Sequence, residues 1–186
     1  MKPETVQIIL LRGVNVGGNK MVPMAELKAW FIRSGFADAR TLLQSGNVVV
    51  RTAAPGGAKL EKQLEAAADK ELKLKADFLV RTRTEWDAIV AGNPFPAEAK
   101  HDPSHLVALV LKAAPAAAQV AAMLAAIPGR EKAVVTGRVA YLYYPDGIGD
   151  SKLTPALLDR TLGSRGSARN WNTVLKIAAL ALSLEP

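Results

Sequence analysis

The apolar segments of this 186-residue chain follow one order twice, and this repeat constrains the fold more than any other feature of the sequence. In the first half they are an apolar run at 6–12, an amphipathic stretch that opens at Pro23, short β-type segments at 39–44 and 47–52, an amphipathic stretch at 58–72 and an apolar segment at 76–81. The predicted order is therefore strand, helix, strand, strand, helix, strand.

The second half of the chain repeats this order. Its segments are a strand at 106–111, a helix at 116–127, a hairpin at 133–144 that turns at Thr136 and Gly137, a helix at 154–162 with Thr154 as its cap, a brief extended piece, and a final helix that Asn170 or Asn172 caps. Two such units predict an α+β protein of two ferredoxin-like (βαββαβ) subdomains in tandem, with antiparallel sheets and helices packed on one face. We place an N-terminal subdomain at 1–83, a linker with a short helix at 84–104, and a C-terminal subdomain with a terminal helix at 105–186.

Helical spacing predicts which side chains face each core. The expected inward residues are Met24, Leu27, Trp30 and Phe31 in the first helix, Leu60, Leu64, Ala68 and Leu72 in the second, Val120, Met123, Leu124 and Ile127 in the third, and Val174, Leu175, Ala178 and Leu182 in the last. On the second helix, the residues expected to face water are Glu61, Lys62, Glu65, Asp69 and Lys73.

The composition excludes several classes of site. There is no cysteine, which removes disulfides, thiolate zinc sites and cysteine nucleophiles, and fits a reducing, cytoplasmic location. The apolar run at 6–11 is too short for a signal peptide, and the alanine-rich window at 113–129 carries Gln119 between two prolines. We therefore expect neither secretion nor a membrane span.

The net charge of +7 is concentrated late in the chain, where residues 152–176 carry five basic side chains against Asp159 alone. A basic surface attracts phosphates, nucleic acids and anionic lipids. Ordinary solubility explains such a surface equally well, so the charge alone does not choose a partner.

Residues 10–20 (LLRGVNVGGNK) suggest a phosphate cradle, because glycines let backbone amides face a phosphate while a lysine supplies charge. The spacing does not fit a P-loop: four residues separate Gly13 from Gly18, but Asn19 follows where lysine is needed, Lys20 comes one residue late, and Met21 follows this lysine in place of the hydroxyl residue that would hold magnesium. A looser anion site remains open, built from the amides of Gly17 and Gly18 and the side chains of Arg12 and Lys20. The alternative is a mobile connection with its basic residues in solvent.

Three further polar clusters lie at turns. In residues 44–47, Gly46 suits a two-residue hairpin, and Ser45 has no nucleophile motif around it. Residues 145–154 contain Lys152, and residues 167–173 open a helix, so a second terminus suited to anions is available. Trp171 in the last cluster reads as a core anchor or, less often, as a stacking face for a base.

The two histidines, His101 and His105, have the spacing of a helical metal pair. Pro103 lies between them and no acidic cluster completes a metal shell, so we predict no metal and no cofactor.

Seven short motifs together carry a family resemblance: LRGVNVGGNK at 11–20, VPMAEL at 22–27, QSGNV at 44–48, VRT at 80–82, NPF at 93–95, SKLT at 151–154 and RNWNTVLK at 169–176. In this order they resemble the bacterial family catalogued as domain of unknown function 1697. The resemblance implies two ferredoxin-like subdomains in one compact protein, and it implies no established activity, cofactor or partner.

The favoured function is non-catalytic binding of a phosphate-bearing or other anionic ligand, a nucleotide or nucleic acid, in a basic cleft. A small ligand is favoured over a polymer because the strands at 6–12 and 47–52 lack the paired aromatics of RNA-binding sheets. The candidate ligand-binding residues are Arg12, Asn15, Gly17, Gly18, Lys20, Gln44, Ser45, Asn47, Lys152, Arg169, Asn170 and Thr173.

Two alternatives remain open. The first is an enzyme acting on a small anionic substrate, although the motifs contain no histidine, cysteine or paired carboxylate, which leaves Lys20 or Lys152 as a base. The second is a protein-interaction scaffold, which predicts that Arg12 and Arg169 are buried in intramolecular hydrogen bonds.

Overall fold

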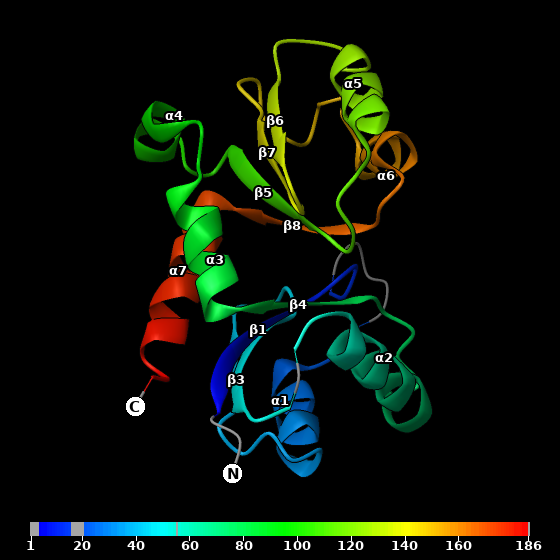
Figure 1. Cartoon of the computed structure of the whole chain (residues 1–186), viewed down its shortest axis with the longest axis vertical. Helices are drawn as coiled ribbons and strands as arrows, with labels where there is room; N and C mark the ends of the chain where they lie inside the picture. Colours follow the sequence, from blue (N-terminus) through cyan, green and yellow to red (C-terminus); the bar gives the residue numbers. More distant parts are fainter. Residues whose placement is uncertain (1–3, 16–20, 55, 186) are drawn as a thin grey trace. The chain divides into compact units, whose positions relative to one another are not determined.

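The chain forms two compact units in a computed structural model that describes residues 4–15, 21–54 and 56–185 (Figure 1). Residues 1–88 and 175–186 make up the first unit, and residues 89–174 make up the second. Both divisions fall within helices, α3 (Arg83–Ala91) and α7 (Trp171–Leu182). The end of the chain thus groups with the first unit, and the subdomain limits at 83 and 105 stay a sequence-based prediction.

Besides its parts of α3 and α7, the described part of the first unit contains a four-stranded antiparallel sheet and two complete helices. Its elements are β1 (Thr5–Leu11), α1 (Met24–Arg33), β2 (Arg40–Leu42), β3 (Asn47–Thr52), α2 (Ala58–Leu72) and β4 (Phe78–Thr82). The strand order is β2-β3-β1-β4, with β1 antiparallel to both neighbours. This βαββαβ path and strand order are those of a ferredoxin-like sandwich.

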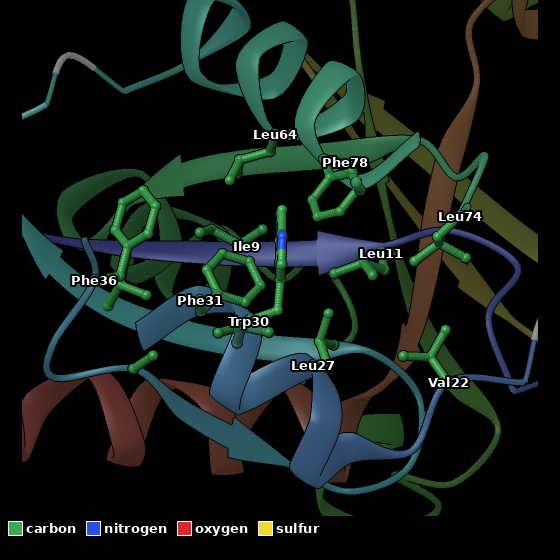
Figure 2. Close-up of a cluster of buried hydrophobic side chains, with 14 of the residues drawn as sticks. Ile9, Leu11, Val22, Leu27, Trp30, Phe31, Phe36, Leu64, Leu74 and Phe78 are labelled. Atoms are coloured by element: carbon green, nitrogen blue, oxygen red, sulfur yellow. The ribbon is translucent and has the colours of Figure 1, made fainter. Parts of the chain in front are cut away.

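The core of this unit lies between one face of the sheet and helices α1 and α2 (Figure 2). Alternation along β1 directs Ile9 and Leu11 to this side, where Trp30 is fully buried. The predicted inward face of α1 is confirmed, because all four of its residues are buried. On the opposite face of β1, Ile8 and Leu10 are also fully buried.

The outer edge of β4 is closed by carboxylates. The register with β1 turns the backbone N–H groups of Phe78, Val80 and Thr82 away from the sheet. They donate to Glu65 Oε1 at 3.0 Å, Glu61 Oε1 at 2.9 Å and Glu85 Oε2 at 2.8 Å, respectively. The prediction that Glu61 faces water is therefore wrong: it is buried because it satisfies a strand edge.

The second unit repeats the first. After the end of α3 and a short helix α4 (Pro96–His101) come β5 (Leu106–Leu111), α5 (Ala117–Ala125), β6 (Lys132–Thr136), β7 (Val139–Tyr143), α6 (Pro155–Leu162) and β8 (Gly166–Asn170). The strand order β6-β7-β5-β8 matches that of the first sheet, and the predicted fold class is confirmed. Helix α4 was not predicted from the sequence.

The caps of the later helices agree with the sequence. Thr154 Oγ1 accepts a hydrogen bond from the N–H of Leu157 at the start of α6. Asn170 Oδ1 accepts one from Thr173 N–H at 3.0 Å, so Asn170 caps the final helix. The hairpin between β6 and β7 turns at Gly137 and Arg138, one residue later than predicted, because Thr136 pairs with Val139.

The predicted inward faces of α5 and α7 are partly wrong. Leu124, Leu175 and Leu182 have 43%, 43% and 57% of their surface exposed. In the final helix and the residue pair that follows it, the buried apolar residues are Trp171, Val174, Ile177, Ala181 and Leu184. The apolar stripe of α7 is therefore rotated from the predicted one.

Candidate functional site

The Asn15 side chain joins the glycine-rich segment to the β2–β3 turn. Asn15 Nδ2 donates to the carbonyl oxygens of Gln44 at 2.8 Å and Val22 at 2.9 Å, and its Oδ1 accepts from Val22 N–H at 2.7 Å. The structure thus brings two predicted clusters together, and it engages the carboxamide of Asn15 internally. Three other candidates in this segment, Gly17, Gly18 and Lys20, lie outside the described residues.

The β2–β3 turn has four residues, 43–46, and not the two residues that the sequence predicted, because Leu42 pairs with Asn47. Asn47 is fully buried and its Nδ2 donates to Leu42 O at 2.9 Å and to Ser45 Oγ at 3.0 Å. Gln44 is exposed, and its carbonyl oxygen accepts from Asn15. These polar groups hold the turn in its conformation.

Gly46 packs so closely against the segment before Asn15 that a side chain does not fit. Its φ is +69°, and an added Cβ would lie 2.6 Å from Val14 Cγ2 and 2.8 Å from Leu11 Cβ. Its carbonyl oxygen accepts from Leu11 N–H at 2.8 Å.

We expect Gly46→Ala to lower the free energy of unfolding by about 2 to 3 kcal/mol, since it combines left-handed strain with overpacking. Gly13→Ala is the matched control, because Gly13 has nearly the same φ, +68°, with nothing within 4 Å of an added Cβ. Urea denaturation should show a loss of only about 1 kcal/mol for this control. Equal losses for both variants would contradict the close packing at Gly46.

Arg12 follows β1 and is half-buried, and its backbone N–H donates to Asp77 O at 2.9 Å. It belongs to the same unit as Asn15 and the β2–β3 turn. Lys152, Arg169, Asn170 and Thr173 belong to the second unit. The meeting of these two groups of residues around one ligand stays a prediction.

Arg169 occupies a repeated structural position. Leu11 pairs with Phe78 in the first sheet, and Leu111 pairs with Gly166 in the second. Arg81 and Arg169 each lie three residues after these partners, so the two arginines occupy equivalent positions in the two sheets. Both are buried, and each donates from Nη1 to the carbonyl of the preceding residue at 2.7 Å.

The surroundings of Arg169 and Lys152 differ strongly. Arg169 Nη1 also donates to Ser167 Oγ at 2.8 Å, and burial lowers the pKa of its guanidinium to about 10. Arg169 therefore still carries its charge at neutral pH. Lys152 is exposed, beside a Ser151 hydroxyl that donates to Glu131.

An open depression of about 860 Å³ lies at the C-terminal end of α2, in the first unit. The described residues that line it are Met21, Val22, Ala66, Asp69, Lys70, Leu72, Lys73, Leu74 and Lys75. Met21 and Val22 directly follow Lys20 in the chain, and Val22 is the residue that Asn15 holds. The two residues that directly follow the predicted glycine-rich segment in the sequence therefore line this depression.

The three lysines of this depression were not among the predicted site residues, because exposed lysines in and just after the end of a helix are typical of a solvated surface. The signal in the sequence is their clustering, at positions 70, 73 and 75. Lys73 ends α2 in a left-handed conformation, with φ at +54°, and its Nζ donates to Lys70 O at 3.2 Å. The positive charge of these lysines thus partly complements the carbonyl groups at the C-terminal end of α2.

The histidines do not pair with each other in the second unit. His105 Nδ1 lies 2.9 Å from Asp102 Oδ2, and the Tyr143 hydroxyl donates to the same carboxylate oxygen at 3.2 Å. The hydrogen bond with His105 holds the pKa of Asp102 below its usual value. Among the described residues, no group of three histidine, aspartate or glutamate side chains is arranged to hold a metal ion.

In the part of the chain that the structure describes, no helix has the length and apolar character needed to cross a membrane.

The fold and the site define an α+β protein of two ferredoxin-like units, one of which carries a lysine-lined depression. The model of a family described as "Protein of unknown function (DUF1697)" matches residues 5–141, and the chain belongs to this family. The matched residues include five of the seven motifs quoted above, while the motifs at 151–154 and 169–176 lie beyond them.

Among solved structures, the chain is similar to conserved bacterial protein SP0830 from Streptococcus pneumoniae. The two are 20% identical, the match covers 96% of this chain and 99% of the other, and the TM-score is 0.73. At this identity the likeness shows the fold alone. No curated protein matched the chain.

Proposed function

We propose that this protein binds a small anion that carries an apolar group, such as a nucleotide, in the depression at the end of α2. The observation that supports this function best is the lining itself, in which Lys70, Lys73 and Lys75 occur together with apolar side chains. Asp69 is the one acidic residue among the described lining residues, which leaves an excess of two positive charges. This excess favours a phosphate-bearing ligand.

The apolar part of the lining defines the rest of the ligand. Val22 and Leu74 are buried, and Met21 is 69% exposed, so a hydrophobic surface is available next to the lysines. A volume of about 860 Å³ lies within the range of small-molecule sites. A phosphate joined to a base or acyl group would contact both the lysines and this surface, whereas inorganic phosphate would contact only the lysines.

The Lys70→Gln/Lys73→Gln/Lys75→Gln variant tests this proposal. We expect ADP to raise the thermal midpoint of the wild-type protein, and we expect the variant to bind ADP about 10- to 100-fold more weakly. Inorganic phosphate and adenosine should each bind less tightly than ADP. Affinity measured by calorimetry should fall as salt rises, because the lysines are exposed.

The matched control is Lys28→Gln/Lys59→Gln/Lys62→Gln, which removes the same charge from exposed positions of α1 and α2 outside the depression. It should retain the affinity for ADP. An equal loss of affinity for ADP in both variants would mean that net charge alone explains the effect. The absence of a thermal shift at about 10 mM ADP would contradict the proposal.

A protein-interaction scaffold is the second candidate, favoured by the internal engagement of predicted site residues. Arg169 donates to Ser167 and Ala168, and Asn15 donates to Gln44 and Val22, as a structural role for these motifs requires. If the ADP experiment fails, this function becomes the better supported one.

A further inference from the structure

Asp102 and His105 form a hydrogen-bonded pair in the second unit, between the end of α4 and the start of β5. His105 Nδ1 lies 2.9 Å from Asp102 Oδ2, and this hydrogen bond lowers the pKa of the Asp102 carboxyl. The carboxylate is therefore ionised at neutral pH and can only accept, so Nδ1 of His105 carries a proton. In the neutral ring, the lone pair is then on Nε2.

Both members of this pair are held in place by further hydrogen bonds. Asp102 Oδ2 also accepts from the Tyr143 hydroxyl at 3.2 Å, and its Oδ1 accepts from the Ser104 hydroxyl at 3.1 Å. The backbone N–H of His105 donates to Asp102 O at 3.2 Å, and its carbonyl oxygen accepts from Tyr144 N–H at 3.0 Å. A carboxylate that is fixed in this way sets both the tautomer and the orientation of the imidazole.

The other ring nitrogen, Nε2 of His105, has no hydrogen-bond partner among the described residues, and the side chain is 40% exposed. Gly147 lies beside it, because a Cβ added to this glycine would be 3.9 Å from Nε2. The next two backbone N–H groups of the same loop, those of Ile148 and Gly149, donate to no described residue. The lone pair is therefore accessible, beside a loop with unused hydrogen-bond donors.

An imidazole in this state suits three roles, which are metal ligand, general base and nucleophile. A metal needs further ligands, and the described residues supply no suitable group of three. A general base needs a substrate held beside it, and neither Asp102 nor His105 is among the described residues that line the depression at α2. A nucleophile needs only the accessible lone pair and the partner that orients the ring, and both are present here.

We propose that His105 accepts a phosphoryl group on Nε2 from a donor with a labile phosphorus–nitrogen bond, that is, a phosphoramidate. The Nε2 lone pair forms the new bond to phosphorus, while the phosphorus–nitrogen bond of the donor breaks and its electron pair leaves with the amine. The ring keeps its proton on Nδ1 and becomes a cation, which the Asp102 carboxylate stabilises. This site is independent of the depression at α2.

The two histidines of the chain supply a matched comparison, because His101 is exposed and no described residue hydrogen-bonds to its side chain. After the full chain is incubated with phosphoramidate, we expect mass spectrometry to show one added phosphoryl group, on His105. The His101→Gln variant should react at the wild-type rate. His105→Gln should react about tenfold more slowly, because its remaining imidazole lacks a carboxylate partner. Equal rates for the two variants, or no phosphorylation of the wild-type protein, would overturn the proposal.

Asp102→Asn tests the positioning role of the carboxylate. Its carboxamide can donate to Nδ1, which moves the ring proton of His105 to Nε2 and removes the attacking lone pair. We expect phosphorylation of His105 to slow about tenfold, and the ring-nitrogen NMR signals of the unmodified protein to change to those of the Nε2–H tautomer. Tyr143→Phe keeps the pair and should change the rate less. Phosphorylation of Asp102→Asn at the wild-type rate would contradict attack by an oriented Nε2.

Discussion

Replacing Trp30 with alanine is expected to lower the free energy of unfolding of the first unit by about 3 to 5 kcal/mol. Trp30 is fully buried between α1, α2 and the sheet, with its ring 4.9 Å from that of Phe31 and 6.3 Å from that of Phe78 (Figure 2). Its Nε1 also donates to Glu71 Oε2 at 2.8 Å. The substitution removes this packing and leaves a cavity at the centre of the core.

Urea denaturation followed by far-UV circular dichroism measures this loss without depending on tryptophan fluorescence. Trp30→Phe is the control, since it keeps a ring in the core and loses the hydrogen bond to the exposed Glu71. It should cost about 1 to 2 kcal/mol. A loss below about 1 kcal/mol for Trp30→Ala would be inconsistent with the central position of this side chain.

Removing the carboxylate of Glu61 should have an effect of similar size. Glu61 Oε1 accepts from Val80 N–H at 2.9 Å and lies 3.6 Å from Arg81 Nη1, and both charged side chains are buried. Glu61→Ala removes the acceptor of an edge N–H and the negative charge beside a buried guanidinium. We expect a loss of about 3 to 5 kcal/mol in the free energy of unfolding.

Glu61→Gln separates the two contributions, because its carboxamide oxygen still accepts from Val80 N–H while the negative charge is gone. It should be more stable than Glu61→Ala and less stable than the wild type. Glu65→Ala is a further comparison: Glu65 is half-buried and accepts from Phe78 N–H, so its loss should cost about 1 to 2 kcal/mol. If Glu61→Ala and Glu65→Ala were equally stable, the ion pair with Arg81 would contribute nothing.

Regular apolar spacing made much of the fold predictable. Helix α2 begins and ends where its leucine stripe predicts, at Ala58 and Leu72, and β3 matches the predicted segment at 47–52. The repeat of the same order of strands and helices in the second half identified both sheets, and the two sheets have the same strand order. Local chemistry also identified Thr154 as the N-cap of α6 and Pro155 as the first residue of this helix.

The incorrect predictions have two physical causes. Either the structural role of a residue depends on a partner far away in the sequence, or the element has no apolar pattern to identify it. Helix α4 has no buried residue, so there was no stripe to read. Glu61 was assigned to solvent because its acceptor role depends on the edge of β4, 19 residues away. The inward face of α7 was misplaced because Leu175 and Leu182 also fit a helical period.

The candidate site was predicted only in part, for the same reason. The sequence selected Asn15 and Gln44, and the structure joins them, but as a structural contact across 29 residues. The lysines of the depression were not selected, because Met21 and Val22, which line the same depression, come from a segment about 50 residues earlier in the sequence. Whether a polar residue binds a ligand or its own backbone depends on such tertiary partners.

The division of the chain within α3 and α7 limits how the protein can be dissected. A fragment that ended before residue 175 would lose Ser183, the acceptor of Arg40, and Glu185, whose Oε1 lies 3.0 Å from Arg83 Nη1. Cutting the chain at the linker would therefore separate the N-terminal half from residues of its own unit. The N-terminal half depends on the C-terminal tail for its completion, so translation must reach the last residues before that half acquires all its contacts.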